Sequence, residues 1–531
     1  MSKLKRTLGI MVVCSMIAAI LMSGCSKAID KNTSDNADAG SSSLVQDSKQ
    51  VKLRWIHAGP GKQQDSVKVW AEFNKQLQTV LPNTTVEIDA IDLTKIEEKF
   101  KLIAASGEDY DIVWTGYKND YTSNVKKGAF LELDSLLQNV APDLRESMPD
   151  WLWEKCKVDG KTYAIPCYGQ MTDTNVGLKF QKALIEKYGD RTKLEKTLLG
   201  TPFVTKEIYD MLTDYLQKAK DGNDLRKGVG VETLGTFLVN KGMSAVYGQF
   251  EYARNEKAPK VVNMYERPEY KLMIDTHADW FKKGFIRKDI LSIQNRRADE
   301  KKEDGYILWS TGHYNSFPDF PQINQDQIDT AAWGYPSVSI PFYDKYFINM
   351  GEPVTMLAIG KASSNPERAL KFLEVLYTDK GKELYNMLVY GLEGVNYKKI
   401  SADRVETIGY SGQSTSDAPY GLWKWTTGNT FNAWYVQTDA DGSNEFALKA
   451  MDTADKSALI DFKVNIEPVK NELAQIAAVE KEYQVSLYSG SLSDYEAKYK
   501  EFIAKMKTAG SDKVKSEFQN QIDAYLKSKG K

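Results

Sequence analysis

The chain has 531 residues, which is too long for one hydrophobic core and predicts about two to four compact units. Its 70 lysine and arginine residues nearly balance 72 aspartate and glutamate residues. The resulting formal net charge of -2 argues against a nucleic-acid partner, because it gives no basic field for a phosphate backbone. With 42% hydrophobic and 27% charged residues, the composition is that of an ordinary globular protein, not of a bundle of membrane helices.

The first 24 residues have the form of a signal peptide. The basic residues Lys3, Lys5 and Arg6 precede an apolar run over residues 8–22, which is too short to favour a transmembrane helix. We therefore expect residues 1–24 to direct export and to be removed.

The end of this segment is similar to the bacterial lipoprotein signal. Small residues precede Cys25, and in that class of protein the cysteine thiol at this position carries diacylglycerol. Met22 stands where the pattern prefers leucine, and the alternative is an ordinary signal peptide with an incidental cysteine. Residues 25–49 are polar and poor in large apolar side chains, so they predict a flexible tether. The resulting expectation is a folded body held on the extracytoplasmic face of the cell membrane by a lipid on Cys25.

Two further cysteines, Cys156 and Cys167, flank a predicted hairpin that turns at Asp159-Gly160. An oxidising compartment permits a disulfide between them, but the hairpin register places Cys167 beyond direct cross-strand reach of Cys156. Two buried free thiols are favoured over the disulfide.

The folded body opens with alternating strand and helix patterns. Residues 51–55, 85–91 and 110–116 read as strands, and residues 67–80 and 96–103 carry the apolar stripes of amphipathic helices. Strand, helix, strand, helix, strand implies right-handed crossovers and a parallel sheet. The fold class is therefore α/β at this end, whereas residues 493–530 predict a helical C-terminal part.

Ligands of open α/β sheets bind at the carboxyl ends of the strands, so the loops after Trp55 and Trp114 are the first candidates for a site. The first loop, residues 57–66, contains a glycine-flanked lysine. A nucleotide-binding loop needs a glycine where Ile56 stands and a hydroxyl residue where Gln63 stands. A phosphate cradle is therefore not expected.

Catalytic signatures are scarce. The chain has 3 histidines and contains no His-Glu-x-x-His, Gly-x-Ser-x-Gly or Cys-x-x-Cys motif. A pair of catalytic carboxylates cannot be judged from sequence spacing, because the pair must meet in space. Residues 439–445 resemble a calcium loop but lack its alternating ligands, so a solvated turn is the better interpretation. We expect no metal and no cofactor.

Aromatic residues are the remaining signal. The chain has 11 tryptophans and 29 tyrosines, many in polar, loop-like contexts. A ring with a polar rim suits a sugar, whose faces present C–H groups and whose edges present hydroxyls. For any single ring, however, a place in the core is the more common outcome.

Several phrases resemble the extracellular solute-binding proteins of carbohydrate ABC importers, the group that includes maltose-binding protein, and in particular its LplA-type lipoprotein branch. They occur in the family's order over nearly all of the mature chain: GEDYDIVWTG, GAFLELDSLL, VDGKTYAIPCY, GYILWSTGHYNSF and SSNPERALKFLEVLYTDKGKELYNMLVYGLEGVNY. The resemblance implies a two-lobed periplasmic-binding-protein-like type II fold with about three hinge crossovers. The implied first lobe is residues 50–168 plus 329–380, and the second is residues 169–328 plus 381–531.

The resemblance also implies a monomeric, non-enzymatic receptor that captures an oligosaccharide or related glycan fragment and delivers it to ABC permease subunits. Two alternatives stay open from the sequence: a secreted glycan-active enzyme, and a two-lobed sensor that docks on a membrane kinase. The residues expected at the ligand are, from the first lobe, His57, Lys62, Gln63, Trp114, Tyr117 and Tyr168, and from the second, Tyr247, Trp309, His313, Tyr314, Trp423, Trp425 and Trp434.

Overall fold

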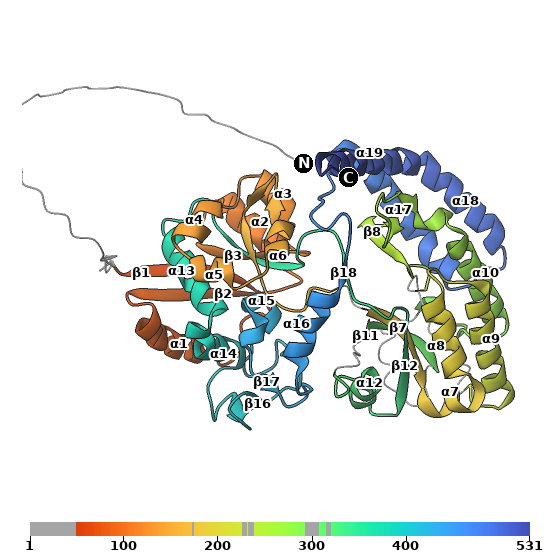
Figure 1. Cartoon of the computed structure of the whole chain (residues 1–531), viewed down its shortest axis with the longest axis horizontal. Helices are drawn as coiled ribbons and strands as arrows, with labels where there is room; N and C mark the ends of the chain where they lie inside the picture. The colour runs from red at the N-terminus through yellow and green to blue at the C-terminus, as the bar shows by residue number, and fades with distance from the viewer. Residues whose placement is uncertain are drawn as a thin grey trace, which may run out of the picture. The chain divides into compact units, whose positions relative to one another are not determined.

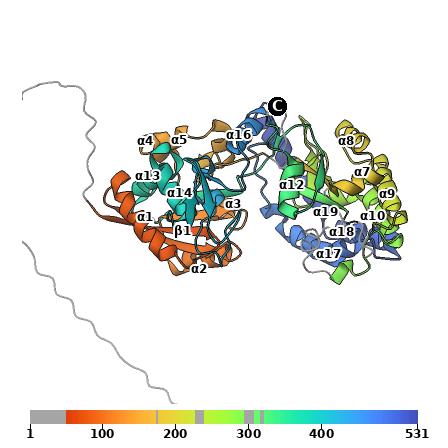
Figure 2. The same ribbon diagram turned by 90° about the horizontal axis from the view of Figure 1, so that it is seen from below.

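A computed structural model of the chain describes residues 49–172, 175–225, 231, 238–292, 307–314 and 320–530 (Figures 1 and 2). The helices in these segments include none that is long and apolar enough to cross a membrane. Two large hydrophobic clusters and one small one organise the folded body.

The first lobe is built on a five-stranded sheet with the order β2-β1-β3-β14-β6. The three N-terminal strands pair in parallel, as predicted, whereas β14 runs antiparallel between β3 and β6. The strands are β1 (Val51–Gly59), β2 (Thr84–Asp92), β3 (Ile112–Gly116), β6 (Ala164–Pro166) and β14 (Thr355–Ile359).

Local sequence explains these first elements. Helix α1 (Ser66–Val80) buries Val69, Phe73 and Leu77 against the sheet, and α2 (Ile96–Ser106) ends at Gly107, which adopts a left-handed φ of 71°. Strand β1 extends four residues beyond the predicted 51–55, because its pairing with β2 continues as far as Gly59 and Asp92. The first candidate loop therefore starts later than the alternating pattern indicated.

The predicted hairpin is present. Strands β4 (Lys157–Val158) and β5 (Lys161–Thr162) pair across Asp159 and Gly160, whose φ values of 51° and 79° fit a type I′ turn. Around it lie the short helices α3 (Tyr121–Lys126), α4 (Asp134–Asn139), α5 (Pro142–Glu146) and α6 (Asp150–Lys155).

The first lobe also takes up a later part of the chain than predicted. Helix α13 (Pro366–Tyr377) packs on it, and so does α14 (Lys382–Tyr390), which lies beside α1 in both views (Figures 1 and 2). Apolar side chains as far as Val436 join the same cluster. Its remaining elements are η4 (Asp379–Gly381), β15 (Tyr397–Lys399), β16 (Arg404–Thr407), α15 (Lys424–Thr427), η5 (Thr430–Asn432) and β17 (Tyr435–Val436).

The second lobe has its own core around a three-stranded sheet with the order β11-β7-β12. These strands are β7 (Asn175–Gln181), β11 (Leu308–Tyr314) and β12 (Ser337–Pro341). A second sheet contains β8 (Met243–Tyr247), β9 (Phe250–Ala253) and β10 (Val262–Asn263). The helices are α7 (Lys182–Tyr188), α8 (Arg191–Gly200), α9 (Lys206–Asp221), η2 (Met264–Glu266), α10 (Pro268–Lys282), η3 (Ile290–Ser292) and α12 (Gln325–Trp333).

The C-terminal part is helical, as predicted, and belongs to this second core. It consists of η6 (Glu467–Val469), α17 (Lys470–Tyr488), α18 (Tyr495–Thr508) and α19 (Ser511–Ser528). Helix α17 contacts α10, and α19 contacts β10, so these helices complete the lobe and form no separate domain (Figure 1).

The lobe boundaries therefore differ from the predicted ones in two places. Residues 384–436 pack in the first core although 381–531 were assigned to the second lobe, because α14 buries its apolar face against α1. Residues 338–342 pack in the second core although 329–380 were assigned to the first, because β12 pairs with β7.

Three chain segments pass between the two clusters, after Cys167, after Phe342 and after Val436. The second and third segments pair in parallel as β13 (Phe347–Ile348) and β18 (Asp455–Lys456). Helix α16 (Ser443–Thr453) lies on the third segment, and its Phe446 and Ala450 belong to the small third cluster with Ile348. The structure thus has the three crossovers that the resemblance implied.

Candidate functional site

Two predicted tryptophans form a stacked pair on the first lobe. The Trp423 and Trp425 rings have centroids 5.3 Å apart and planes inclined by 18°, and both side chains are half-buried. The indole N–H of Trp423 donates to the carbonyl of Ser414 at 2.7 Å. A pocket of about 140 Å³ adjoins the pair and is lined also by Tyr390, Tyr410, Gln413, Lys424 and Asp439.

Gln63 fixes the loop that carries this pair. Its amide nitrogen donates to Ser414 Oγ and to the Thr415 carbonyl, each at 2.7 Å, and its amide oxygen accepts from the Gly421 N–H at 2.9 Å. The side chain is only 5% exposed, so these three bonds use its hydrogen-bonding capacity inside the protein. Gln63 was expected to direct ligand hydroxyls, but here its hydrogen bonds position residues 414–425, the tryptophan loop, which carries the stacked pair.

His57 has a similar supporting place. It is fully buried, and its Nε2 lies 3.2 Å from Thr427 Oγ1 and 3.3 Å from Thr426 Oγ1, at the end of α15. Burial lowers the pKa of His57 to about 3, so the ring is neutral at physiological pH. The ring packs edge-on against Trp55 beneath the surface, so it has no exposed face for the predicted ligand contact.

Trp114 also supports the pair from below. It is fully buried, and its indole N–H donates to Thr355 Oγ1 at 2.7 Å. The Thr355 hydroxyl in turn donates to the carbonyl of Trp425 at 2.9 Å. Two successive hydrogen bonds therefore connect the middle of β3 to the stacked pair, and the Trp114 ring itself has no exposed face to offer to a ligand.

Trp434 lies in the core, contrary to the expectation that it would be a ligand platform. It is 4% exposed and stacks with Tyr390, with centroids 6.4 Å apart and planes within 7°. Lys399 covers its ring at 4.5 Å. Tyr168 is half-buried against Phe431, and its carbonyl accepts from the Thr430 N–H at 2.7 Å.

Tyr117 and Tyr247, predicted from different lobes, line one pocket. They are 55% and 42% exposed, and the pocket has a volume of about 570 Å³. Glu352 and Lys463 also line it, and burial raises the pKa of Glu352 and lowers that of Lys463. The pocket adjoins the second and third crossovers, so its lining brings together residues that follow β3 and residues of the second lobe.

The other predicted residues contribute no geometry to this site. Lys62 is exposed on the loop after β1. The side chains of Trp309, His313 and Tyr314 lie outside the described part of β11, and Cys25 lies in the undescribed residues 1–48. Their predicted roles remain predictions.

The turn at residues 439–445 uses its carboxylates within the fold. Asp439 accepts from the Val436 N–H at 3.1 Å, and Asp441 pairs with Arg404 at 2.5 Å. Across the described segments no cluster of three or more acidic, histidine or cysteine side chains is arranged to hold a metal ion. Cys156 and Cys167 are buried free thiols, as favoured, and burial raises the pKa of each to about 12.

Comparison with known proteins places this geometry in a family. Residues 67–383, more than half of the chain, match the profile described as bacterial extracellular solute-binding protein. The chain belongs to this family. Its members are binding proteins and not enzymes. A second profile, a domain of unknown function called DUF3502, matches residues 458–527 of this solute-binding protein, which are the helices that complete the second core.

A carbohydrate ABC transporter substrate-binding protein from Streptococcus pneumoniae serotype 4 is 25% identical to this solute-binding protein over 455 residues, covering 81% of this chain and 82% of the relative. The crystal structure of an N-glycan transport solute-binding protein from Streptococcus pneumoniae is 23% identical, with a TM-score of 0.70 over 90% of this chain and 99% of that one. An HMO-binding ABC-transporter-associated solute-binding protein from Bifidobacterium longum infantis is 15% identical, with a TM-score of 0.61 over 90% and 100%. These structures share the two-lobed fold of this chain.

Reasoning from the sequence missed the residues that hold the tryptophan loop. Thr355, Ser414 and Thr427 are small and polar, and nothing in their local sequence distinguishes them from surface residues. Thr355 lies on a strand next to β3, and that neighbourhood is the signal that could have identified it.

Proposed function

We propose that this solute-binding protein captures an oligosaccharide or glycan fragment and delivers it to the permease of an ABC importer. The observation that best supports this proposal is the stacked Trp423–Trp425 pair, which offers an apolar ring surface. The pocket beside it is also lined by the polar residues Lys424, Gln413 and Asp439. Such a surface suits the C–H faces and hydroxyl edges of a sugar. The relatives named for carbohydrate and N-glycan transport support the same ligand class.

In this proposal, His57, Gln63 and Thr355 act as positioning residues. Their hydrogen bonds hold the tryptophan loop in one conformation before ligand arrives. Preorganisation of this kind saves the free energy of ordering the loop on binding. Tyr117, Tyr168 and Tyr247 offer further ring surfaces, and bound ligand would stabilise the closed arrangement of the lobes that a permease recognises.

Isothermal titration calorimetry with oligosaccharides that vary in linkage, length and charge tests the proposal. For the oligosaccharide that binds most tightly, Trp423→Ala should lose about 2 kcal/mol of binding free energy, roughly a 30-fold rise in Kd. Trp423→Phe, which keeps a ring, should lose less. Trp151→Ala removes another half-buried tryptophan, on α6, and should keep the wild-type Kd.

Unchanged affinity in Trp423→Ala would remove the stacked pair from the site. Release of shortened glycans during prolonged incubation would contradict capture without turnover. Absence of binding to every oligosaccharide by the folded protein would overturn the proposed ligand class.

The membrane anchor is a separate proposal, supported by the signal pattern before Cys25 and by the polar tether that follows it. We propose that the mature protein is a monomer held by a lipid on this cysteine at the extracytoplasmic face of the cell membrane. Cell fractionation should find the wild-type protein and Cys14→Ser in the membrane fraction, and Cys25→Ser released or retained as unprocessed precursor. Equal, correctly processed membrane association of all three proteins would refute the anchor.

A further inference from the structure

One tyrosine hydroxyl reaches the stacked pair from a helix outside the tryptophan loop. Tyr385, on α14, is fully buried, and its hydroxyl donates to the carbonyl of Lys424 at 2.8 Å. This carbonyl belongs to the peptide bond that joins Lys424 to Trp425, between the two stacked rings in the sequence. Burial raises the pKa of Tyr385 well above its usual value, so the hydroxyl stays protonated and remains a donor.

The two neighbouring carbonyls are held in the same way. The carbonyl of Trp423 accepts from Thr427 Oγ1 at 2.8 Å and from Thr426 Oγ1 at 3.0 Å. The carbonyl of Trp425 accepts from Thr355 Oγ1 at 2.9 Å. Three successive carbonyls therefore accept from side-chain hydroxyls. Because the peptide unit is planar, a fixed carbonyl direction also fixes the plane of its peptide, so these bonds restrict rotation of the backbone that carries both rings.

The donors differ in where they are anchored. Thr426 and Thr427 lie on α15 itself, so their bonds would follow any movement of this short helix. Tyr385 instead belongs to the first core, and its helix α14 packs beside α1. Its ring also lies against the end of α15, where a Cβ atom added at Gly428 would approach the ring to 3.3 Å. One side chain thus contacts both ends of α15 and ties the orientation of this helix to the core.

We propose that Tyr385 is a positioning residue for glycan binding, whose hydroxyl sets the angle between the Trp423 and Trp425 rings. Tyr385 is not among the described residues that line the adjoining pocket, and its side chain is fully buried, so it acts on the ligand through the loop. The expected effect on affinity rests on the function proposed above, whereas the ring geometry can be measured without ligand.

Circular dichroism of the full chain reports the ring geometry. Two closely stacked indoles couple electronically and give paired far-ultraviolet bands of opposite sign, whose amplitude depends on the distance and angle between the rings. The difference between the wild type and Trp425→Phe measures the contribution of the pair. Tyr385→Phe removes one oxygen atom and should reduce this paired signal in the unliganded protein, because the Lys424 peptide loses its donor from the core.

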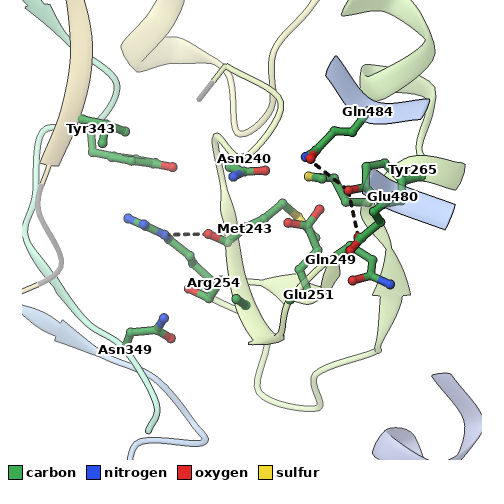
Figure 3. Close-up of a pocket in the computed structure, with 15 residues that line it drawn as sticks. Asn240, Met243, Gln249, Glu251, Arg254, Tyr265, Tyr343, Asn349, Glu480 and Gln484 are labelled. Atoms are coloured by element: carbon green, nitrogen blue, oxygen red, sulfur yellow. Dashed lines mark hydrogen bonds between the residues drawn. The ribbon is translucent and has the colours of Figure 1, made fainter. Parts of the chain in front are cut away.

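Isothermal titration calorimetry measures the consequence for the ligand. For the oligosaccharide that binds the wild type most tightly, Tyr385→Phe should raise the Kd about fivefold, the loss of one hydrogen bond of about 1 kcal/mol. The matched control is Tyr265→Phe in the second lobe, which removes the hydroxyl of another buried tyrosine. Figure 3 shows this hydroxyl beside Glu480, to which it donates at 2.9 Å. Thermal unfolding should show a lower Tm for both variants, but Tyr265→Phe should keep the wild-type Kd and paired signal.

The proposal is overturned if Tyr385→Phe keeps the paired signal or the Kd of the wild type. It is also overturned if Tyr265→Phe changes both quantities equally, since the effect would then be one of general stability. If the folded wild type binds no oligosaccharide, the function proposed above fails, and the paired signal alone decides whether Tyr385 orients the rings.

Discussion

The substitution Gln63→Leu removes the hydrogen bonds that support the tryptophan loop and leaves the rings of Trp423 and Trp425 unchanged. Leucine occupies a similar volume but removes the amide that bonds Ser414, Thr415 and Gly421. At about 1 kcal/mol for each bond, the loss is about 3 kcal/mol of unfolding free energy. The Thr415 carbonyl and the Gly421 N–H are left without this partner, which opposes any gain from the apolar side chain.

Urea denaturation followed by circular dichroism measures the change, with the midpoint and slope compared between variants. The matched control is Gln64→Leu, the same substitution at the next, exposed position. We expect the control to stay within about 0.5 kcal/mol of wild type, the usual range for surface changes. Glycan affinity of the folded Gln63→Leu protein should also fall, because the loop must be ordered on binding.

The reasoning fails if Gln63→Leu is as stable as Gln64→Leu, since the three bonds would then contribute nothing to the fold. The claim that Gln63 prepares the loop for ligand also fails if the unfolding free energy falls by about 3 kcal/mol but affinity for the same glycan is unchanged. In that outcome the loop would be part of the architecture alone.

Three further predictions follow from burial. Burial lowers the pKa of His57 to about 3, whereas the unfolded value is about 6.5, so only the unfolded chain binds a proton at this residue as the pH falls below 6.5. Between pH 7 and pH 5 the wild type should therefore lose about 2 kcal/mol more unfolding free energy than His57→Gln, measured by urea denaturation. Equal losses in the two proteins would contradict a buried, neutral ring. Trp434→Ala should lower the unfolding free energy by about 3–5 kcal/mol but leave the glycan Kd of the folded protein unchanged. Unchanged stability with a raised glycan Kd would instead show that Trp434 contacts the ligand. Cys156 and Cys167 should resist iodoacetamide in the native protein and both react in urea, as mapped by peptide mass spectrometry, whereas native labelling would show that the thiols are accessible.

The first elements of the fold were predictable because their signals are local. The apolar stripe of α1 and the alternation that begins β1 specify both element and buried face within a few residues. The crossovers followed from the family resemblance. The lobe boundaries depended on contacts between distant segments, such as β12 with β7 and α14 with α1, and no local pattern shows which partner a strand or helix selects.

The sequence identifies candidate ring platforms by residue type but does not show which of them the fold leaves exposed. Trp114, Trp423 and Trp434 are chemically alike, and the sequence around each is aromatic and polar. In the structure, Trp114 is buried and bonds the hydroxyl of Thr355 on β14, and Trp434 is buried against other aromatic rings. Trp423 is only half-buried. Exposure depends on what the rest of the chain places above each ring, so it could not be read from neighbouring residues.

The position of β14 also governs when each lobe can fold during synthesis. Strand β14 stands between β3 and β6, so the first sheet has a gap until residue 359 has left the ribosome. The first core closes only with Val436, and the second needs the helix that ends at Ser528. Neither lobe can therefore complete its core as an early, independent unit, because each waits for a segment synthesised much later.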